Sequence, residues 1–220
     1  MKTRTILLML LALTFTSTAL LAQRDKRESK GLKKEIKKKA VKEARKEAKK
    51  FKKDGYAVAP GALPMEKQIE TAWMRQYEVD EDGYPLYIVA SGNSVANTTA
   101  AAKLQATELA KLELAGSIST QVAALIETNI ANQQLNSEEA ASVTKTVAAA
   151  KNIIAQDLGR TLPLFEIYRT LKNKNVEVNV RIAYNSKKAQ EIARQAIKKK
   201  LEEETDIAQD KLEKLMKWDN

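Results

Sequence analysis

The chain has 220 residues, of which 38 are Lys or Arg and 28 are Asp or Glu, giving a formal net charge of +10 at pH 7. It contains no cysteine and no histidine, which excludes disulfides, thiol nucleophiles, thiolate metal sites and histidine-based acid–base or zinc chemistry. The length suffices for one domain with tails. A hydrophobic share of 44% with only 5% aromatic residues predicts a core of Ala, Leu, Ile and Val.

Residues 1–22 have the pattern of a secretory signal peptide. A positively charged start is followed by an apolar run over Ile6–Leu13 and by small residues that lead to Ala22. An uncleaved membrane anchor is the alternative, but hydroxyl side chains interrupt the run from Thr14 onward, well short of the ~20 apolar residues of a span. We therefore expect export, cleavage after about Ala22, and a periplasmic or outer-membrane-associated protein.

A strongly basic arm, residues 23–55, comes next. Within 24–53, sixteen Lys or Arg outnumber five Asp or Glu, a net of +11. Since the signal segment holds two more positive charges, the chain from Asp54 onward carries about −3. Apolar residues three and four apart predict a helix with a narrow apolar stripe.

The arm is predicted to bind an anionic surface or polymer electrostatically. Its candidate contacts are Lys33, Lys34, Lys37, Lys38, Lys42, Arg45, Lys46, Lys49 and Lys50. The alternative is a solvated, partly frayed helix that only keeps the protein soluble. We expect the partner to be an anionic envelope component or an envelope protein, with peripheral membrane contact as an open option.

Nucleic acid, cofactors and metal ions are not expected. An exported chain meets little nucleic acid, and Phe51 and Tyr56 are the only rings near the arm, too few for base stacking. The acidic turn Asp80–Gly83 resembles part of a calcium loop but lacks the closing Glu. The sequence leaves the oligomeric state open.

The next stretch, residues 56–83, is predicted to be a linker with one short helix. Gly and Pro punctuate its first half, and Pro64 suits the first turn of a helix over residues 65–78. Trp73 lies on the inward face of that helix, and we interpret it as core packing rather than a ligand platform.

Residues 84–220 are predicted to form an α+β domain that begins with a strand and a long helix. Tyr84–Ser91 is the strand; both its faces are apolar, which favours a central place in the sheet, and Gly92 with Asn93 is expected to end it. The helix is expected over Ser94–Ile126. Its apolar stripe consists of Ala102, Ala106, Leu109, Ala110, Leu114, Ile118, Val122 and Leu125.

A polar turn over residues 128–136 is expected to separate this helix from a second one. Asn136 and Glu139 have the spacing of a capping box at its start. Apolar residues spaced three and four apart carry the second helix to about Asp157.

Two strands and a last helix complete the domain. Leu162–Leu171 and Val176–Tyr184 alternate in polarity and are predicted to form a hairpin with one wet face and one face covered by helices. The last helix starts at Ser186, reaches nearly to the C-terminus and is expected to pack on its own domain. The fold class is α+β: a small antiparallel sheet of three strands, in the order strand–helix–helix–strand–strand–helix, covered by long alanine-rich helices, with the basic helical arm in front.

One resemblance to a known family rests on this order of elements and on the segment LAKLELAGSISTQV within Gly92–Val122. Both are similar to the secreted domain family named for a twenty-kilodalton helicobacter lipoprotein (LPP-twenty-like), which is related to the N-terminal domain of a flagellar-assembly protein. The likeness covers residues 84–200 and implies a non-catalytic envelope component, as in similar Bacteroidota envelope proteins. The namesake is lipid-anchored, whereas this chain has no cysteine, so the arm is expected to replace that attachment.

One catalytic pattern competes with this interpretation. Ser142 and Lys145 match the S-x-x-K element of serine acyl enzymes, but the K-T-G element is absent. Glu138 and Glu139 are adjacent at a helix start, where they suit the cap and the helix dipole rather than a glycosidase pair. We expect a non-catalytic exported protein that binds or scaffolds. The alternatives are a cell-wall or carbohydrate hydrolase that uses Ser142 and Lys145 or carboxylates, and self-association through the helix over 187–218.

Overall fold

The structure is a computed structural model that describes residues 31, 34–132, 135–205 and 207–216. The predicted signal peptide, residues 1–22, and the predicted site residue Lys33 lie outside these ranges. The basic segment forms a helix over residues 34–53, called the arm helix below. The elements after it are α2 (Met65–Tyr77), β1 (Tyr87–Ala96), α3 (Thr99–Asn132), α4 (Ser137–Ala149), α5 (Lys151–Asp157), β2 (Leu162–Thr170), β3 (Val176–Asn185), α6 (Ser186–Glu204) and α7 (Gln209–Leu215).

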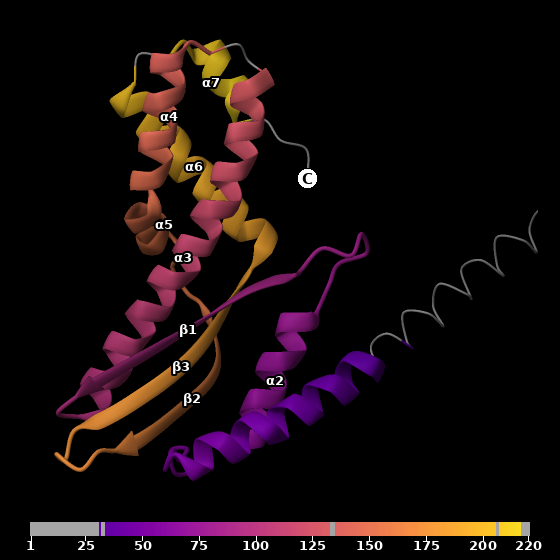
Figure 1. The fold of residues 1–220 in the computed structure, drawn as a ribbon, viewed down its shortest axis with the longest axis vertical. Helices are drawn as coiled ribbons and strands as arrows, with labels where there is room; N and C mark the ends of the chain where they lie inside the picture. Colours follow the sequence, from indigo (N-terminus) through magenta and orange to yellow (C-terminus); the bar gives the residue numbers. More distant parts are fainter. Residues whose placement is uncertain (1–30, 32–33, 133–134, 206, 217–220) are drawn as a thin grey trace, which may run out of the picture.

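The fold is α+β, as predicted, with a three-stranded antiparallel sheet in the order β1-β3-β2 (Figure 1). The prediction of a central β1 is wrong, because β3 lies between β1 and β2. The strand is apolar on both sides because helices cover both faces: Ile88 and Ala90 pack toward α3, and Tyr87 and Val89 pack toward α2 and the arm helix. The predicted wet face of the β2–β3 hairpin is covered in the same way, so that prediction is wrong too.

Gly92 does not end β1, contrary to the sequence prediction. The strand continues to Ala96, and α3 starts only at Thr99. A Cβ atom on Gly92 would lie 1.9 Å from the backbone oxygen of Ala106 and 2.7 Å from the backbone nitrogen of Ala110. The glycine therefore lets the backbone of α3 approach the strand closely, which is a packing role rather than a breaking role.

The long helix α3 runs along the sheet and continues into a bundle with the helices that follow it (Figure 1). Its buried hydrophobic residues are Ala102, Ala106, Ala110, Leu114, Ala115, Ile118, Val122 and Ile126. The prediction for Leu109 is wrong, since that side chain is 48% exposed. By length and composition α3 could cross a membrane, but here it is the core helix between the sheet and the bundle.

The predicted capping box is confirmed: the Asn136 side chain accepts from the backbone N–H of Glu139, and the Glu139 carboxylate accepts from the backbone N–H of Asn136. The second helix is divided at Ala150 into α4 and α5. The last helix is also divided, because Thr205 has an extended backbone and α7 folds back onto the bundle. The buried Leu212 supports the prediction that this end packs on its own domain.

Candidate functional site

The arm helix is sorted into a buried apolar face and an exposed basic face. Ala40, Ala44 and Ala48, one helical turn apart, are at most 1% exposed. Ala44 and Ala48 belong to the same buried cluster as Ile69 of α2 and Phe165 of β2. Because alanine side chains are small, the arm helix lies close to α2 and the sheet, and the arm is part of the folded body.

One carboxylate of the arm helix joins two other elements. Glu47 Oε1 accepts from Arg181 Nη2 of β3 at 2.7 Å, and Glu47 Oε2 accepts from Trp73 Nε1 of α2 at 2.7 Å. The Arg181 guanidinium also lies over the Phe165 ring, 4.7 Å from its centroid. The Trp73 ring therefore packs against the core, as predicted, and its indole N–H also helps to hold the arm helix. Sequence reasoning missed Glu47 and Arg181 because their pairing depends on tertiary packing across 134 positions.

The C-terminal end of the arm helix is held by aromatic side chains and by a second ion pair. Phe51 packs edge-on against Tyr56 at 5.3 Å and against Phe165 at 6.0 Å, measured between ring centroids. Lys52 pairs with Glu66 in the first turn of α2. These contacts fix how the helix is rotated, and hence which side chains it presents to solvent.

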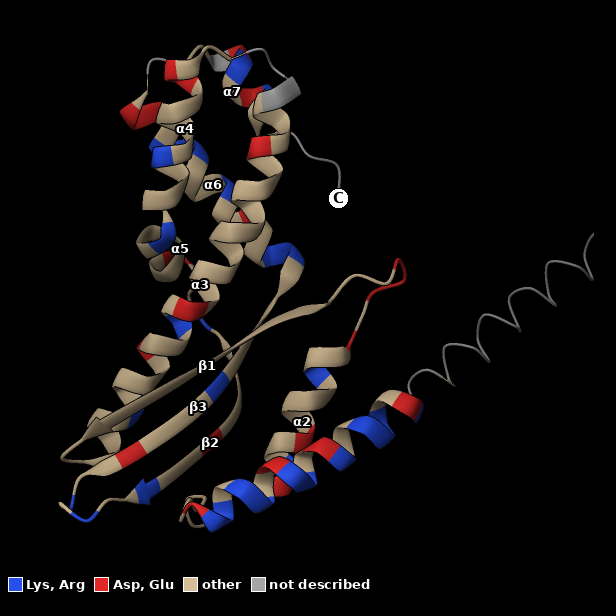
Figure 2. Cartoon of the chain, in the orientation of Figure 1, with Lys and Arg blue, Asp and Glu red and all other residues tan. Residues whose placement is uncertain are grey.

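All eleven Lys and Arg side chains of residues 34–53 are exposed, whereas Glu43 and Glu47 are half-buried. Figure 2 shows how densely the Lys and Arg positions follow one another along this helix. Eight of the nine predicted contact residues lie in this helix. Lys46 pairs with Glu43 at 3.1 Å. No carboxylate in the described part of the chain forms an ion pair with the other seven, which are Lys34, Lys37, Lys38, Lys42, Arg45, Lys49 and Lys50.

Five of the predicted residues lie on one face of the arm helix and line a shallow, open cavity. It has a volume of about 550 Å³ and is lined by Lys34, Lys37, Lys38, Val41, Lys42 and Arg45. The described helix carries a net charge of +8 over residues 34–53, on a length of about 30 Å at 1.5 Å per residue. Such a line of one sign can hold several anionic groups at once.

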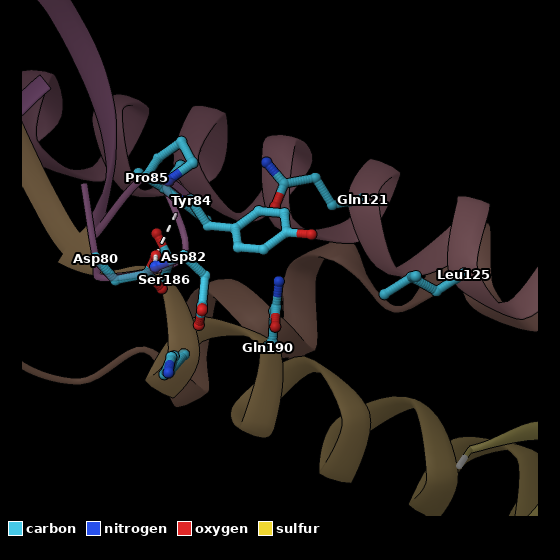
Figure 3. Close-up of a pocket in the computed structure, with 10 residues that line it drawn as sticks. Asp80, Asp82, Tyr84, Pro85, Gln121, Leu125, Ser186 and Gln190 are labelled. Carbon is cyan, nitrogen blue, oxygen red and sulfur yellow. Dashed lines mark hydrogen bonds between the residues drawn. The ribbon is translucent and has the colours of Figure 1, made fainter. Parts of the chain in front are cut away.

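A second cavity, of about 790 Å³, lies between the turn before β1, α3 and the start of α6 (Figure 3). Figure 3 shows the Tyr84 ring between the amides of Gln121 and Gln190, with the carboxylates of the turn at one end. The hydroxyl oxygen of Ser186, in its wall, is buried and has no hydrogen-bond partner in the described part of the chain. Three segments that are distant in sequence build this cavity, so no local sequence pattern indicates it.

The lining of this cavity does not select one class of ligand. It combines carboxylates, an ammonium group, amides and apolar side chains. Asp80 Oδ1 accepts from the backbone N–H groups of Asp82 and Tyr84, so that carboxylate closes its own turn. Within the described ranges there is no group of three or more side chains suited to holding a metal ion.

The candidate catalytic residues line neither of these two cavities. Ser142 and Lys145 are both on α4, with Ser142 half-buried and Lys145 exposed. Glu139 is engaged in the capping box and binds Lys211 at 2.9 Å. The hydrogen bond from Lys211, together with the capping contact at Asn136, lowers the pKa of Glu139, as befits a structural carboxylate.

Comparison with known protein families, with curated proteins and with solved structures finds no match to this chain.

Proposed function

We propose that this protein is a non-catalytic binding or scaffolding protein of the cell envelope, and that the arm helix contacts an anionic surface or polymer there. The observation that supports this most is that the arm helix has one buried apolar face and one exposed basic face. The alanine face and Glu47 attach the helix to the rest of the protein, while every Lys and Arg of residues 34–53 remains exposed to solvent.

The docked state of the helix favours binding in two ways. A helix already held by the body loses little conformational freedom when it binds, so more of the electrostatic attraction appears as affinity. Each Lys or Arg near an anionic membrane surface contributes about 1 kcal/mol, and seven of these side chains have no competing ion pair among the described residues. Export, if the N-terminal segment acts as a signal, would place this face toward envelope polymers or lipids.

The test compares two charge reversals of equal size in the full chain. One variant carries Lys38→Glu, Lys42→Glu and Arg45→Glu on the arm helix. The control carries Lys188→Glu, Lys199→Glu and Lys214→Glu at exposed positions on the body. Binding to immobilised dextran sulfate and to phosphatidylglycerol vesicles is measured across a range of salt concentrations.

The arm variant is expected to lose affinity for both probes, by about tenfold or more at low salt, and to show a weaker salt dependence. The body variant is expected to bind nearly as well as the parent chain. Equal losses in the two variants would mean that net charge, rather than the arm helix, governs binding, and would contradict the proposal.

A further inference from the structure

We propose that the anionic partner is a lipid bilayer, and that the loop over residues 59–64 inserts its apolar side chains among the lipid headgroups beside the arm helix. This inference rests on the function proposed above and narrows its partner from any anionic surface to one with an apolar interior.

The loop is an exposed, uncharged turn with the sequence APGALP. All six of its residues are exposed, and Leu63 is 65% exposed. The backbone is nevertheless fixed. Ala62 N–H donates to the carbonyl of Ala59 at 3.0 Å, Gly61 has a φ of +80°, and Gln68 Nε2 donates to the carbonyl of Leu63 at 2.7 Å. The Leu63 side chain is therefore held in solvent by an ordered turn.

The loop emerges directly beside the last turn of the arm helix. On one side, Ala57 forms a two-bond bridge with Tyr168 of β2; on the other, Glu66 forms the ion pair with Lys52. The lysines that precede the loop in sequence are Lys49, Lys50, Lys52 and Lys53, all of them exposed, and Lys67, which follows it, pairs with Glu70 at 2.9 Å. The acidic groups nearby are Asp54, which is exposed, and Glu66, Glu70 and Glu177, which pair with Lys52, Lys67 and Arg169.

The turn between β2 and β3 extends the basic region along the same edge of the molecule. Figure 2 shows this turn and the arm helix along the lower edge, with blue Lys and Arg positions on both. Lys172 and Lys174 in the turn are exposed, and Arg169 at the end of β2 donates to the carbonyl of Asp54 at 2.8 Å, which ties the two regions together. Cationic side chains thus lie on both sides of the apolar loop.

An apolar tip flanked by lysines matches the boundary between headgroups and acyl chains of an anionic bilayer. A soluble polyanion offers the lysines a partner but leaves Leu63 in water. Leu104, Leu109 and Leu112 on α3 are also exposed, but the lysines next to them are paired, Lys103 with Glu166 at 2.7 Å and Lys111 with Glu108 at 3.0 Å. Near the loop, by contrast, Lys49, Lys50 and Lys53 have no ion pair among the described residues.

The experiment uses the full chain with Leu63→Ser, and with Leu104→Ser as the matched control, since Leu104 is 64% exposed. Neither substitution changes charge. Affinity is measured for phosphatidylglycerol vesicles and, separately, for dextran sulfate. Leu63→Ser is expected to weaken vesicle binding about threefold or more, the effect of withdrawing part of one leucine side chain from an apolar layer, and to leave dextran sulfate binding unchanged. Leu104→Ser is expected to change neither.

Unchanged vesicle binding by Leu63→Ser, or equal losses for vesicles and polymer, would overturn the bilayer assignment. If the arm reversal abolishes binding to both probes while Leu63→Ser affects neither, the bilayer inference fails and the proposed function stands. If the arm reversal itself has no effect, both fail.

A spectroscopic readout supports the affinity measurement. Because the chain has no cysteine, Leu63→Cys and Leu104→Cys each give a single labelling site for an environment-sensitive fluorophore. The label at 63 is expected to shift to the blue on vesicles, whereas the label at 104 is expected not to shift. A shift at 104 alone would identify the α3 surface as the inserting one and would contradict the inference.

Discussion

Arg181 of β3 and Glu47 of the arm helix form an ion pair of 2.7 Å in which the side chains are only 15% and 19% exposed. The same carboxylate accepts a hydrogen bond from Trp73 of α2. This pair shows how a helix with so many like charges is held on the body. The acidic side chain that faces inward is used as the anchor, and the basic ones face outward.

Removing the charge of Glu47 is expected to destabilise the protein. Glu47→Gln keeps the shape of the side chain but leaves the guanidinium of Arg181 mostly buried without its counter-charge, at a cost of about 1–3 kcal/mol. Urea unfolding of the parent and the variant measures this difference. The control is Glu43→Gln, one turn earlier, where the pair with Lys46 is more exposed and should contribute less than about 0.5 kcal/mol. Equal midpoints for the two variants would show that Glu47 is not the anchor.

Substitution by alanine is expected to change stability in opposite directions at Gly92 of β1 and Gly116 of α3. Gly92→Ala puts a methyl group within 1.9 Å of the backbone oxygen of Ala106, so α3 and β1 must separate. We expect a loss of about 2 kcal/mol or more. Gly116→Ala meets only the flexible end of Lys151 at 3.1 Å, and in a helix interior alanine is favoured by roughly 1 kcal/mol. Thermal unfolding of both variants measures these changes. An unfolding temperature unchanged by Gly92→Ala would contradict the close packing of α3 against β1.

Acid is expected to weaken the network around Glu177 on β3. Burial alone would raise the pKa of this carboxyl, but hydrogen bonds from Asn93, Arg169 and Tyr56 outweigh it and hold the pKa below its usual range. Because the pKa is lower in the folded chain than in the unfolded chain, this stabilisation is complete above about pH 5 and is lost as the pH falls through the folded value.

Glu177→Gln should therefore lower stability at neutral pH, by about 1 kcal/mol, and flatten its fall as the pH drops below about pH 5. Chemical unfolding at several pH values measures both effects. Stability curves of the parent and the variant that run parallel over this range would show that Glu177 is not the titrating group.

The sequence predicted the local structure better than the packing. The alternation in Val176–Tyr184 and the capping box at Asn136 are local patterns, and both are confirmed. The place of β1 at the edge, the role of Gly92 and the exposure of Leu109 depend on which elements lie beside them. A strand covered on both faces has the same composition whether it is central or at an edge, so its position could not be inferred.

The basic residues of the candidate site were found from composition, because a run of lysines is visible in the sequence alone. The way in which the helix is held was not predicted. Alanines at Ala40, Ala44 and Ala48 are compatible with a loose helix or a docked one, and only the partners on α2 and the sheet decide between them. The proposed role of Leu63 likewise depends on its exposure in an ordered turn, which the sequence does not show.

Hydrogen exchange of the arm amides in the free, full-length protein tests the central claim most directly. If the arm helix is docked through its alanine face and Glu47, the amides of residues 44–51 should be protected to a degree similar to those of α2. Exchange of these amides at the rate of an unfolded chain, with α2 still protected, would show a loose tether and contradict the account.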